Sequence, residues 1–309
     1  MRPVPEKRLA MECEDRKHAV RRGLLWWARW ENLSWLEPAL EGVLRLFGLY
    51  ERGLQNVLHP RLSRQEIPLP QLPTAFDGFR IFWISDLHSD RIDGLIENVL
   101  NLAAQAEYDI AVLGGDFCFD HRMTETAAHH ARQIAQKLAQ KTPVYAVLGN
   151  HDYAPLVDIL RNCGVTVLLN ENTAICCAGQ TLRLIGVDDC HYFKSDDLES
   201  AMQGIDKNEF TVLLSHSPEL YAHAAQKGVH LMLSGHTHGG QICLPGGRAV
   251  VSSIDAPRKC IRGLWNHKQL TGFTSIGAGA SGVAVRYNCT GEINLLTLRK
   301  APNKNTNRR

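Results

Sequence analysis

The stretch FRIFWISDLH, residues 79–88, joins a run of aromatic and β-branched side chains to two residues that can bind a metal. The run 79–85 has the composition of a buried strand, because β-branched and aromatic residues are enriched in strands. Asp86 and His88 follow where that strand should end. A lone aspartate in such a place is usually a turn former or a helix cap, so the rest of the chain decides what this pair means.

Strand-like and helix-like segments alternate after residue 76. Segments 94–106 and 124–141 have helical composition and separate short apolar runs. This alternation is typical of an α/β fold, in which helices cover the faces of a sheet. The expected strands are 79–85, 109–113, 143–148, 165–169, 182–187, 210–214, 230–233, 272–276, 283–287 and 293–298.

Metal-binding residue types follow five of these strands in succession. In open α/β sheets ligands bind beyond the carboxyl ends of the strands, so these side chains are expected to converge on one rim. A lone buried histidine is more often a hydrogen-bonded core residue than a ligand, but five coordinated coincidences favour a site. The residues are Asp86 with His88, Asp116, Asn150, His216, and His236 with His238.

The chemistry of this set favours divalent ions. Carboxylate, imidazole and amide oxygen suit manganese, iron, zinc or magnesium, and the absence of cysteine from the set argues against a purely structural zinc site. Two such ions about 3.5–4 Å apart can clamp the attacking and leaving oxygens of a phosphoryl displacement. A carboxylate shared between the ions would hold them at that separation.

The ordered blocks of this chain resemble the motif set of the calcineurin-like metallophosphoesterases, and the resemblance spans residues 79–298. It implies a four-layer α/β/β/α sandwich with mixed sheets. It also implies two metal ions, manganese first, that hold a bridging hydroxide as the nucleophile. The blocks are Asp86-Leu87-His88, Gly115-Asp116, Gly149-Asn150-His151-Asp152, Ser215-His216 and Gly235-His236-Thr237-His238.

The resemblance also distributes the ligands between two ions, with Asp116 bridging. One ion would be held by Asp86, His88, Asp116 and His238, and the other by Asp116, Asn150, His216 and His236.

The same resemblance makes His151 the general acid for the leaving oxygen, a task suited to an imidazole near neutrality. Asp152 is expected either to orient His151 or to cap a helix that starts near Ala154. One departure stands out, because Asp120 lies four residues after Asp116 where the family usually has an aspartate three residues after. No metal role is assigned to Asp120.

Segments 234–247 and 277–286 look like a bacterial subgroup that includes membrane-associated phosphodiesterases and UDP-diacylglucosamine pyrophosphatases of lipid A biosynthesis. Gly239 and Gly240 are expected to let backbone amides approach a phosphate, although a tight turn beside the metals needs the same glycines. Arg286 is a candidate phosphate contact, and the alternative is an exposed strand arginine.

Residues 1–58 are predicted to form an amphipathic helical segment, divided near Pro38. Trp26 and Trp30, preceded by basic residues, suit an anionic membrane interface. Packing on the catalytic domain or a dimer contact is the alternative. Residues 59–75 read as a proline-rich linker, 76–300 as the catalytic domain and 301–309 as a frayed tail.

Composition narrows the remaining choices. The formal net charge of +2 gives no reason to expect nucleic-acid binding. Nine cysteines without a C-x-x-C spacing argue against a disulfide framework or a zinc knuckle and favour buried free thiols. No secretory signal or spanning helix is apparent, so a cytoplasmic protein, peripheral on the cytoplasmic face of the inner membrane, is expected.

Three functions follow from these expectations. The first is hydrolysis of a phosphodiester or pyrophosphate bond in a membrane-lipid precursor such as UDP-diacylglucosamine. The second is a soluble nucleotide phosphodiesterase. The third is a non-catalytic scaffold, which is disfavoured because all seven ligand positions and His151 are present.

Overall fold

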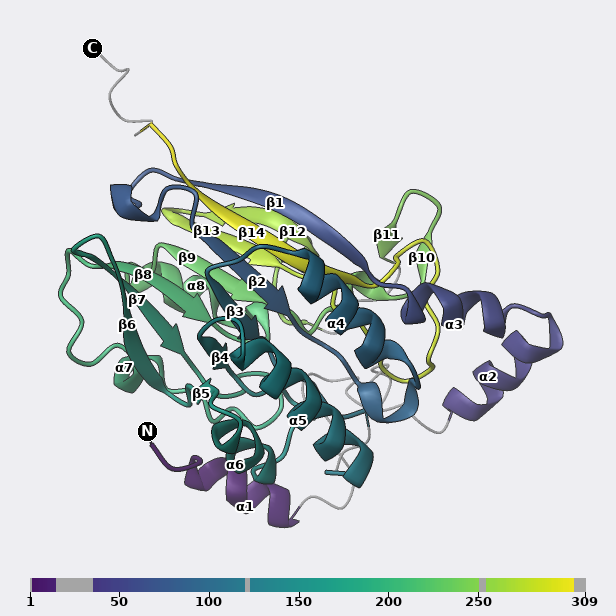
Figure 1. The fold of residues 1–309 in the computed structure, drawn as a ribbon. Helices are drawn as coiled ribbons and strands as arrows, with labels where there is room; N and C mark the ends of the chain where they lie inside the picture. The colour runs from purple at the N-terminus through teal and green to yellow at the C-terminus, as the bar shows by residue number, and fades with distance from the viewer. Residues whose placement is uncertain (1, 15–35, 120–122, 250–253, 303–309) are drawn as a thin grey trace.

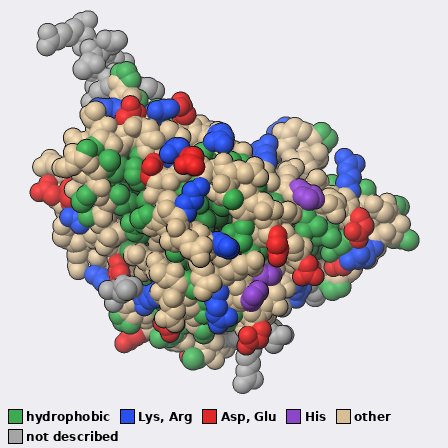
Figure 2. All heavy atoms as spheres, viewed as in Figure 1, with side chains coloured by type: hydrophobic (Ala, Val, Ile, Leu, Met, Phe, Trp, Pro, Cys, Tyr) green, Lys and Arg blue, Asp and Glu red, His purple; other side chains and the backbone are tan. Residues whose placement is uncertain are grey.

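Two mixed six-stranded sheets lie face to face, with helices on both outer faces (Figure 1). The structure is a computed structural model, and it describes residues 2–14, 36–119, 123–249 and 254–302. On the face shown in Figure 2, acidic and basic side chains are intermixed, and neither kind forms a large patch.

The first sheet has the order β1-β14-β2-β3-β4-β5. Strand β14 runs parallel to β1 and antiparallel to β2, and the pairs from β2 to β5 are parallel. The last strand of the fold therefore lies inside the sheet, between the first two. The strands are β1 (Arg61–Leu69), β2 (Arg80–Ile84), β3 (Ile110–Leu113), β4 (Val144–Ala146), β5 (Thr166–Val167) and β14 (Glu292–Lys300).

The second sheet has the order β12-β13-β9-β8-β7-β6. Its four central strands are parallel, and antiparallel strands flank them at both edges. The strands are β6 (Glu171–Cys177), β7 (Gln180–Gly186), β8 (Phe210–Leu214), β9 (Leu231–Ser234), β12 (Gly263–His267) and β13 (Leu270–Thr274). A separate hairpin joins β10 (Cys243–Leu244) to β11 (Arg248–Ala249).

Alternate side chains of a strand point to opposite faces of its sheet, and so they belong to different hydrophobic cores. In β2, Ile81 and Trp83 face the second sheet, whereas Phe82 and Ile84 pack under helices. Helices α4 (Leu95–Gln105), α5 (Glu125–Ala139) and α6 (Pro155–Asn162) cover the first sheet. Helices α7 (Leu198–Ala201) and α8 (Tyr221–Gln226) cover the second. The predicted α/β/β/α layering with mixed sheets is confirmed.

Short 3-10 helices join these elements. They are η4 (Thr74–Phe76), η5 (Ser89–Arg91), η6 (Pro218–Leu220), η7 (His238–Gly240) and η8 (Arg258–Ile261). Of these, η7 carries a predicted metal ligand.

Within the described part of residues 1–58, three helices precede the sheets: α1 (Glu6–Glu14), α2 (Glu37–Leu46) and α3 (Tyr50–Leu58). Pro38 lies in the first turn of α2, where proline is tolerated because the N–H it lacks has no helical partner anyway. Helices α2 and α3 pack Leu40 and Leu54 against Val283 and Val285. Trp26 and Trp30 lie outside the described residues. None of the described helices has the length and apolarity that crossing a membrane requires.

Two expectations from the sequence are wrong, one about a linker and one about a strand. The proline-rich stretch 59–75 is no free linker, because β1 lies within it and pairs with β14 over its whole length. Pro68 is tolerated there because β1 is an edge strand, and an edge strand has N–H positions that need no ladder partner. Residues 283–287 form no named strand and make only one isolated bridge, between Ile242 and Tyr287.

All nine cysteines are free, as expected. The expectation that the thiols are buried holds for only part of the set, because Cys13 and Cys176 are exposed.

Candidate metal centre

The seven predicted ligands lie in turns after five strands, β2, β3, β4, β8 and β9, so both sheets contribute to one rim. Backbone hydrogen bonds tie these turns together. The N–H of Asp86 donates to Gly115 O at 2.9 Å, and the N–H of His88 donates to Asp116 O at 3.1 Å. The N–H of Gly235 donates to His216 O at 2.8 Å in the same way. The convergence expected from strand topology is therefore present.

Five of the predicted ligands adopt the left-handed backbone conformation that non-glycine residues rarely enter. Such conformations cluster at functional sites, where the surrounding structure holds them in place. The φ angles are 56° for Asp86, 42° for His88, 58° for Asp116, 69° for His236 and 47° for His238.

Glycines make room for two of the carboxylates. A Cβ added to Gly149 would lie 2.1 Å from Asp116 Oδ1, and one added to Gly235 would lie 2.4 Å from Asp86 Oδ2. Both distances are far shorter than any allowed contact, so the glycines that precede two ligand motifs are needed for their size. The motif glycines thus let the ligand-bearing turns approach one another.

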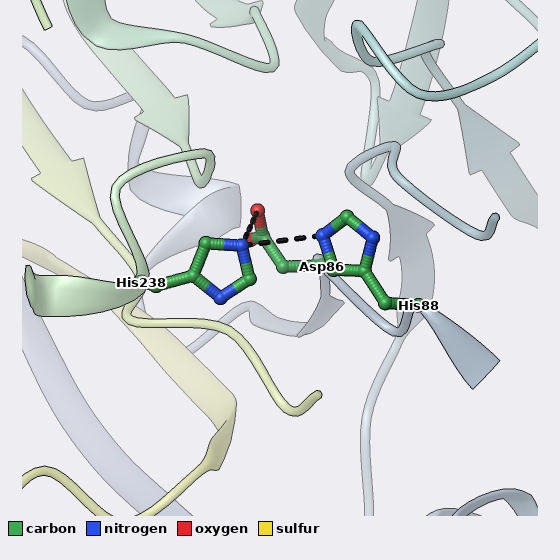
Figure 3. Close-up of side chains that lie close together, drawn as sticks. All are labelled: Asp86, His88 and His238. Atoms are coloured by element: carbon green, nitrogen blue, oxygen red, sulfur yellow. Dashed lines mark hydrogen bonds and ion pairs between the residues drawn. The ribbon is translucent and has the colours of Figure 1, made fainter. Parts of the chain in front are cut away.

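Asp86, His88 and His238 form the first cluster, in which His238 of η7 points toward the two side chains from the turn after β2 (Figure 3). Nε2 of His88 lies 3.2 Å from Nε2 of His238. Nε2 of His238 lies 3.7 Å from Asp86 Oδ1. All three side chains are buried. A carboxylate with two imidazoles at these separations can surround one small cation.

Asp116, His216 and His236 form the second cluster, and Asp116 reaches both. Oδ2 of Asp116 lies 3.1 Å from Nε2 of His216 and 3.6 Å from Nε2 of His88. It therefore stands between a histidine of each cluster, as a bridging ligand must. The structure thus brings together six of the seven predicted ligands in two clusters that lie on either side of Asp116.

Several donor atoms in the clusters have no hydrogen-bond partner among the described residues. Buried polar atoms are nearly always satisfied in folded proteins, so a group of unsatisfied atoms that all belong to one site indicates a missing ligand. The donor set of carboxylates, imidazoles and one amide oxygen fits divalent ions. The atoms are Asp86 Oδ2, Asn150 Oδ1 and His236 Nε2.

Backbone carbonyls orient two of the imidazole ligands. Nδ1 of His88 lies 2.6 Å from Cys118 O, and Nδ1 of His216 lies 2.7 Å from Gly114 O. When Nδ1 donates its proton to a carbonyl, Nε2 keeps its lone pair for a metal. These contacts set the tautomer that metal binding requires.

The charge of the clusters also favours cations. Burial opposes a charge on His216, but Asp116 and Asp86 outweigh it and raise the pKa of His216 to about 10. Burial and the neighbouring imidazoles keep the pKa values of His236 and His238 well below 6.5. The metal-free site therefore holds a proton on His216 that a divalent ion would displace.

His151 lies beside both clusters, within ligand distance of His88 and Asp116. Its Nδ1 lies 3.0 Å from Phe119 O, and its N–H donates to Asp116 Oδ1 at 2.9 Å. Burial lowers the pKa of His151 to about 4, despite the negative charge of Asp116. The ring is thus neutral at neutral pH in the metal-free protein and is partly exposed, unlike the buried imidazole ligands.

Asp152 does not cap α6, which has no side-chain cap and starts after Ala154. Its carboxylate instead accepts three backbone N–H groups, from Asp116 at 2.7 Å, Phe117 at 2.8 Å and Gly149 at 2.9 Å. Burial, with the charge of Asp116, raises the pKa of Asp152 to about 6. Asp152 therefore joins the turn after β3 to the turn after β4.

The expected phosphate contacts have other partners. The N–H of Gly239 faces Thr237 Oγ1 at 3.2 Å, and the N–H of Gly240 donates to Thr237 O at 2.9 Å, so the tight-turn alternative describes both glycines. Arg286 is fully buried, and its guanidinium donates to backbone carbonyls that include Gly279 O and Ile276 O. The prediction of Arg286 as a phosphate contact is wrong, as is the exposed strand arginine. Asp120 lies outside the described residues.

Arg8 of helix α1 is a residue that the sequence analysis missed. It is fully buried, and it donates to Gly149 O at 2.8 Å and to Asp152 O at 2.7 Å, at the two ends of the turn that carries Asn150. Its charge pairs with Asp188 at 2.9 Å. Only the ion pair with Glu12 is local, and the partners that place Arg8 in the site lie 141 or more residues away.

A second missed group lies against His236. The ring of His191 is 4.3 Å from that of His236, and Nδ1 of His191 lies 2.9 Å from Glu219 Oε1. Asp189 holds the turn of His191 by accepting backbone N–H groups from His191 to Phe193. The run Asp188-Asp189-Cys190-His191 after β7 was the available signal, since it too follows a strand.

Comparison with known proteins agrees with this geometry. A family model described as calcineurin-like phosphoesterase matches residues 79–240. A bovine transmembrane protein with metallophosphoesterase domain is 30% identical over 291 residues, which cover 86% of this chain and 63% of that protein. The chain thus spans less than two thirds of the length of that relative.

Two bacterial proteins are similar over shorter stretches. The uncharacterized metallophosphoesterase YkoQ of Bacillus subtilis is 31% identical in an alignment that covers 69% of this chain and 81% of the length of YkoQ. The phosphodiesterase YaeI of Escherichia coli is 28% identical over 71% of this chain and 82% of its own. With its two ligand clusters and a family match over more than half of its residues, the chain belongs to the calcineurin-like phosphoesterases.

Proposed function

We propose that the protein hydrolyses a phosphodiester or pyrophosphate bond with two divalent metal ions, manganese first and iron, zinc or magnesium as alternatives. The observation that supports this most directly is the pair of buried clusters that share Asp116, with unsatisfied donor atoms directed at the same site. When bound, the two ions supply Lewis acidity to the phosphoryl oxygens. Asp86, His88, Asp116 and His238 would hold one ion, and Asp116, Asn150, His216 and His236 the other.

His151 is proposed as the proton donor to the leaving oxygen. It is the imidazole next to the clusters that is not needed as a ligand, and it is more exposed than they are. Its low pKa makes it a strong acid once protonated, and the negative charge of a bound phosphodiester facing Nε2 would raise that pKa toward neutrality. The contact of Nδ1 with Phe119 O keeps Nε2 directed away from the backbone.

Asp152 is proposed as a positioning residue for this acid. Its three backbone hydrogen bonds fix the turns on which His151 and Asp116 lie. It therefore acts on His151 through the main chain.

A membrane-lipid precursor such as UDP-diacylglucosamine is the proposed substrate, taken from the cytoplasmic face of the inner membrane. Apolar side chains at the α2–α3 turn are exposed, with Leu46 at 81% and Phe47 at 71%. This turn lies at the projecting end of the molecule in Figure 1, and exposed apolar tips of this kind insert into lipid interfaces. The sequence around Trp26 and Trp30, which lie outside the described residues, is also typical of a membrane interface.

A soluble nucleotide phosphodiesterase is the alternative, and it needs no lipid contact. It predicts that Leu46→Ser with Phe47→Ser leaves activity and vesicle binding unchanged. A non-catalytic scaffold would bind metal without turning over any phosphoester.

The test starts from protein stripped of metal by a chelator and reloaded with Mn²⁺. UDP-diacylglucosamine and bis(4-nitrophenyl) phosphate are assayed side by side for native protein, Asp116→Asn and His151→Gln. Loss of a bridging carboxylate should abolish turnover, and loss of a general acid should lower kcat by roughly 10²–10⁴-fold. His129→Gln, an exposed histidine of α5, is the matched control and should stay within twofold.

Release of UMP with this pattern would support the lipid substrate. Turnover of the aryl diester alone would leave the soluble phosphodiesterase, and metal binding without any turnover would leave the scaffold.

A further inference from the structure

A cavity of about 320 Å³ lies outside the metal clusters, on the side of the β10–β11 hairpin. Three of its five lining residues are arginines: Arg248, Arg258 and Arg262. Ala249 and Ile261 complete the wall. A cavity of this size accommodates a phosphoryl group with its hydration, or a larger anionic moiety.

None of the three guanidinium groups forms an ion pair with a carboxylate among the described residues. Arg258 Nη2 donates to Ala249 O at 3.0 Å, and Arg262 Nη2 donates to Gly239 O. Neither acceptor carries a formal charge. Several other arginines on the surface do pair with acids, as Arg183 does with Glu209 at 2.8 Å and Arg299 with Glu66 at 2.8 Å. Three like charges around one cavity therefore lack the counter-charge that would offset their repulsion.

The cavity shares a wall with the turn that bears two of the proposed metal ligands. Thr237, between His236 and His238, donates from its hydroxyl to Ile261 O. Arg262 contacts Gly239 O, one residue after His238. The cavity therefore borders the turn that carries His236 and His238.

We propose that Arg248, Arg258 and Arg262 form an anion subsite that binds a second phosphate of the substrate, so that diphosphate-containing substrates are favoured over simple diesters. The inference rests on the proposed function, because it extends the same catalytic site. Guanidinium groups bind phosphate through paired charge-assisted hydrogen bonds, which is the chemistry that three unpaired arginines offer. The second phosphate would supply the counter-charge that the protein lacks here.

The subsite is tested with one substrate and two inhibitors. Hydrolysis of bis(4-nitrophenyl) phosphate is inhibited with methylenediphosphonate, which carries two anionic groups, and with methylphosphonate, which carries one. The ratio of the two inhibition constants measures the second contact, and metal chelation by the diphosphonate is the same for every variant. The variants are Arg248→Gln with Arg258→Gln, and Arg64→Gln, an exposed arginine of β1, as the matched control.

The native protein and the control should favour the diphosphonate, and the double variant should lose about 10–100-fold of that advantage, since hydrogen bonds to charged groups are the strong ones. Turnover of the aryl diester should stay within twofold, because neither substituted residue contacts the metal turn. An advantage that survives in the double variant, or its absence from native protein, overturns the subsite.

Two further measurements separate the possible failures. Calorimetric binding of methylenediphosphonate to metal-free protein, native against double variant, tests the subsite even if no phosphoester is turned over. Binding to phosphatidylglycerol vesicles tests whether the second phosphate is a lipid headgroup. If the double variant loses vesicle binding and keeps its inhibition ratio, the cavity binds a headgroup and the substrate assignment is wrong.

Discussion

Two buried arginines, Arg8 and Arg286, brace different turns of the metal centre in different ways. Arg8 hydrogen-bonds to the turn of Asn150, and its charge is neutralised by Asp188, which lies 2.9 Å away. The ring of Phe193 also lies under its guanidinium group at 4.1 Å. Arg286 approaches the turn of His238 and makes its hydrogen bonds mainly to backbone carbonyls. Both side chains are fully buried.

The two arginines also differ in the direction in which their surroundings shift the pKa. Burial acts to lower the pKa of Arg8, but Asp188 and Asp189 outweigh it and the pKa rises. For Arg286 burial prevails and lowers the pKa. Burial and His88 lower the pKa of His238, and the positive charge of Arg286, 3.2 Å from Nδ1 of His238, adds to them. Arg8 therefore supplies geometry, whereas Arg286 supplies geometry and a field.

The largest effect is expected for Arg286→Met. At least two buried carbonyls, Gly279 O and Ile276 O, lose a charged donor, and a buried unsatisfied group costs about 1–3 kcal/mol. The free energy of unfolding should fall by about 3–5 kcal/mol, measured by denaturant titration of metal-free protein. Unchanged stability would mean that Arg286 acts only through its field.

Arg8→Met should cost about 3 kcal/mol, because it leaves the buried carboxylate of Asp188 without its ion pair. The double variant Arg8→Met with Asp188→Asn should recover part of that loss, while kcat stays low because the turn of Asn150 is still unbraced. Lys7→Gln, on the same helix but exposed, is the control. If the two substitutions instead lower the free energy of unfolding additively, Arg8 does not act by neutralising Asp188.

Glu219→Gln tests whether the pair of His191 and Glu219, beside His236, stabilises the fold through its charges as the pair of Arg8 and Asp188 does. Burial opposes ionisation of Glu219, but the hydrogen bond and charge of His191 lower its pKa to about 2. A depressed carboxylate pKa stabilises the fold above about pH 4.5 and loses that contribution as the pH falls toward 2. The variant should be less stable by about 1–2 kcal/mol at pH 6, with a difference that vanishes near pH 2. Urea titrations across this range would show it, and a pH-independent difference would exclude the linkage.

The smallest effect is expected for Glu12→Gln, one turn after Arg8. Both carboxylate oxygens of Glu12 lie 3.1 Å from the N–H of Ala154, at the start of α6. Burial raises the pKa of Glu12, so losing the charge costs little, and weaker hydrogen bonds to Ala154 and Arg8 should lower stability by only about 0.5–1 kcal/mol. Thermal unfolding beside Glu14→Gln, an exposed residue of the same helix, is sufficient to measure it. A larger fall would show that Glu12 matters mainly through Arg8.

The convergence of the proposed metal ligands was predictable because each follows an apolar strand, and strand topology brings such positions to one rim. The layering followed from the alternation of strands and helices. Strand β1 was missed because Pro68 and its neighbours have linker composition, and only pairing with β14 makes them a strand. Arg286 was misjudged because burial of a guanidinium depends on carbonyls from several turns, which the local sequence does not reveal.

The place of β14 has a consequence for biosynthesis. Arg61 of β1 and Glu292 of β14 are partners across 231 residues, and β14 separates β1 from β2. During translation the first sheet therefore stays open in its interior until residues 292–300 have left the ribosome. Until then β1 and β2 expose unpaired edges, which are sites of aggregation. Nascent chains of this protein should depend on chaperones late, and cleavage before residue 292 should leave no stable product.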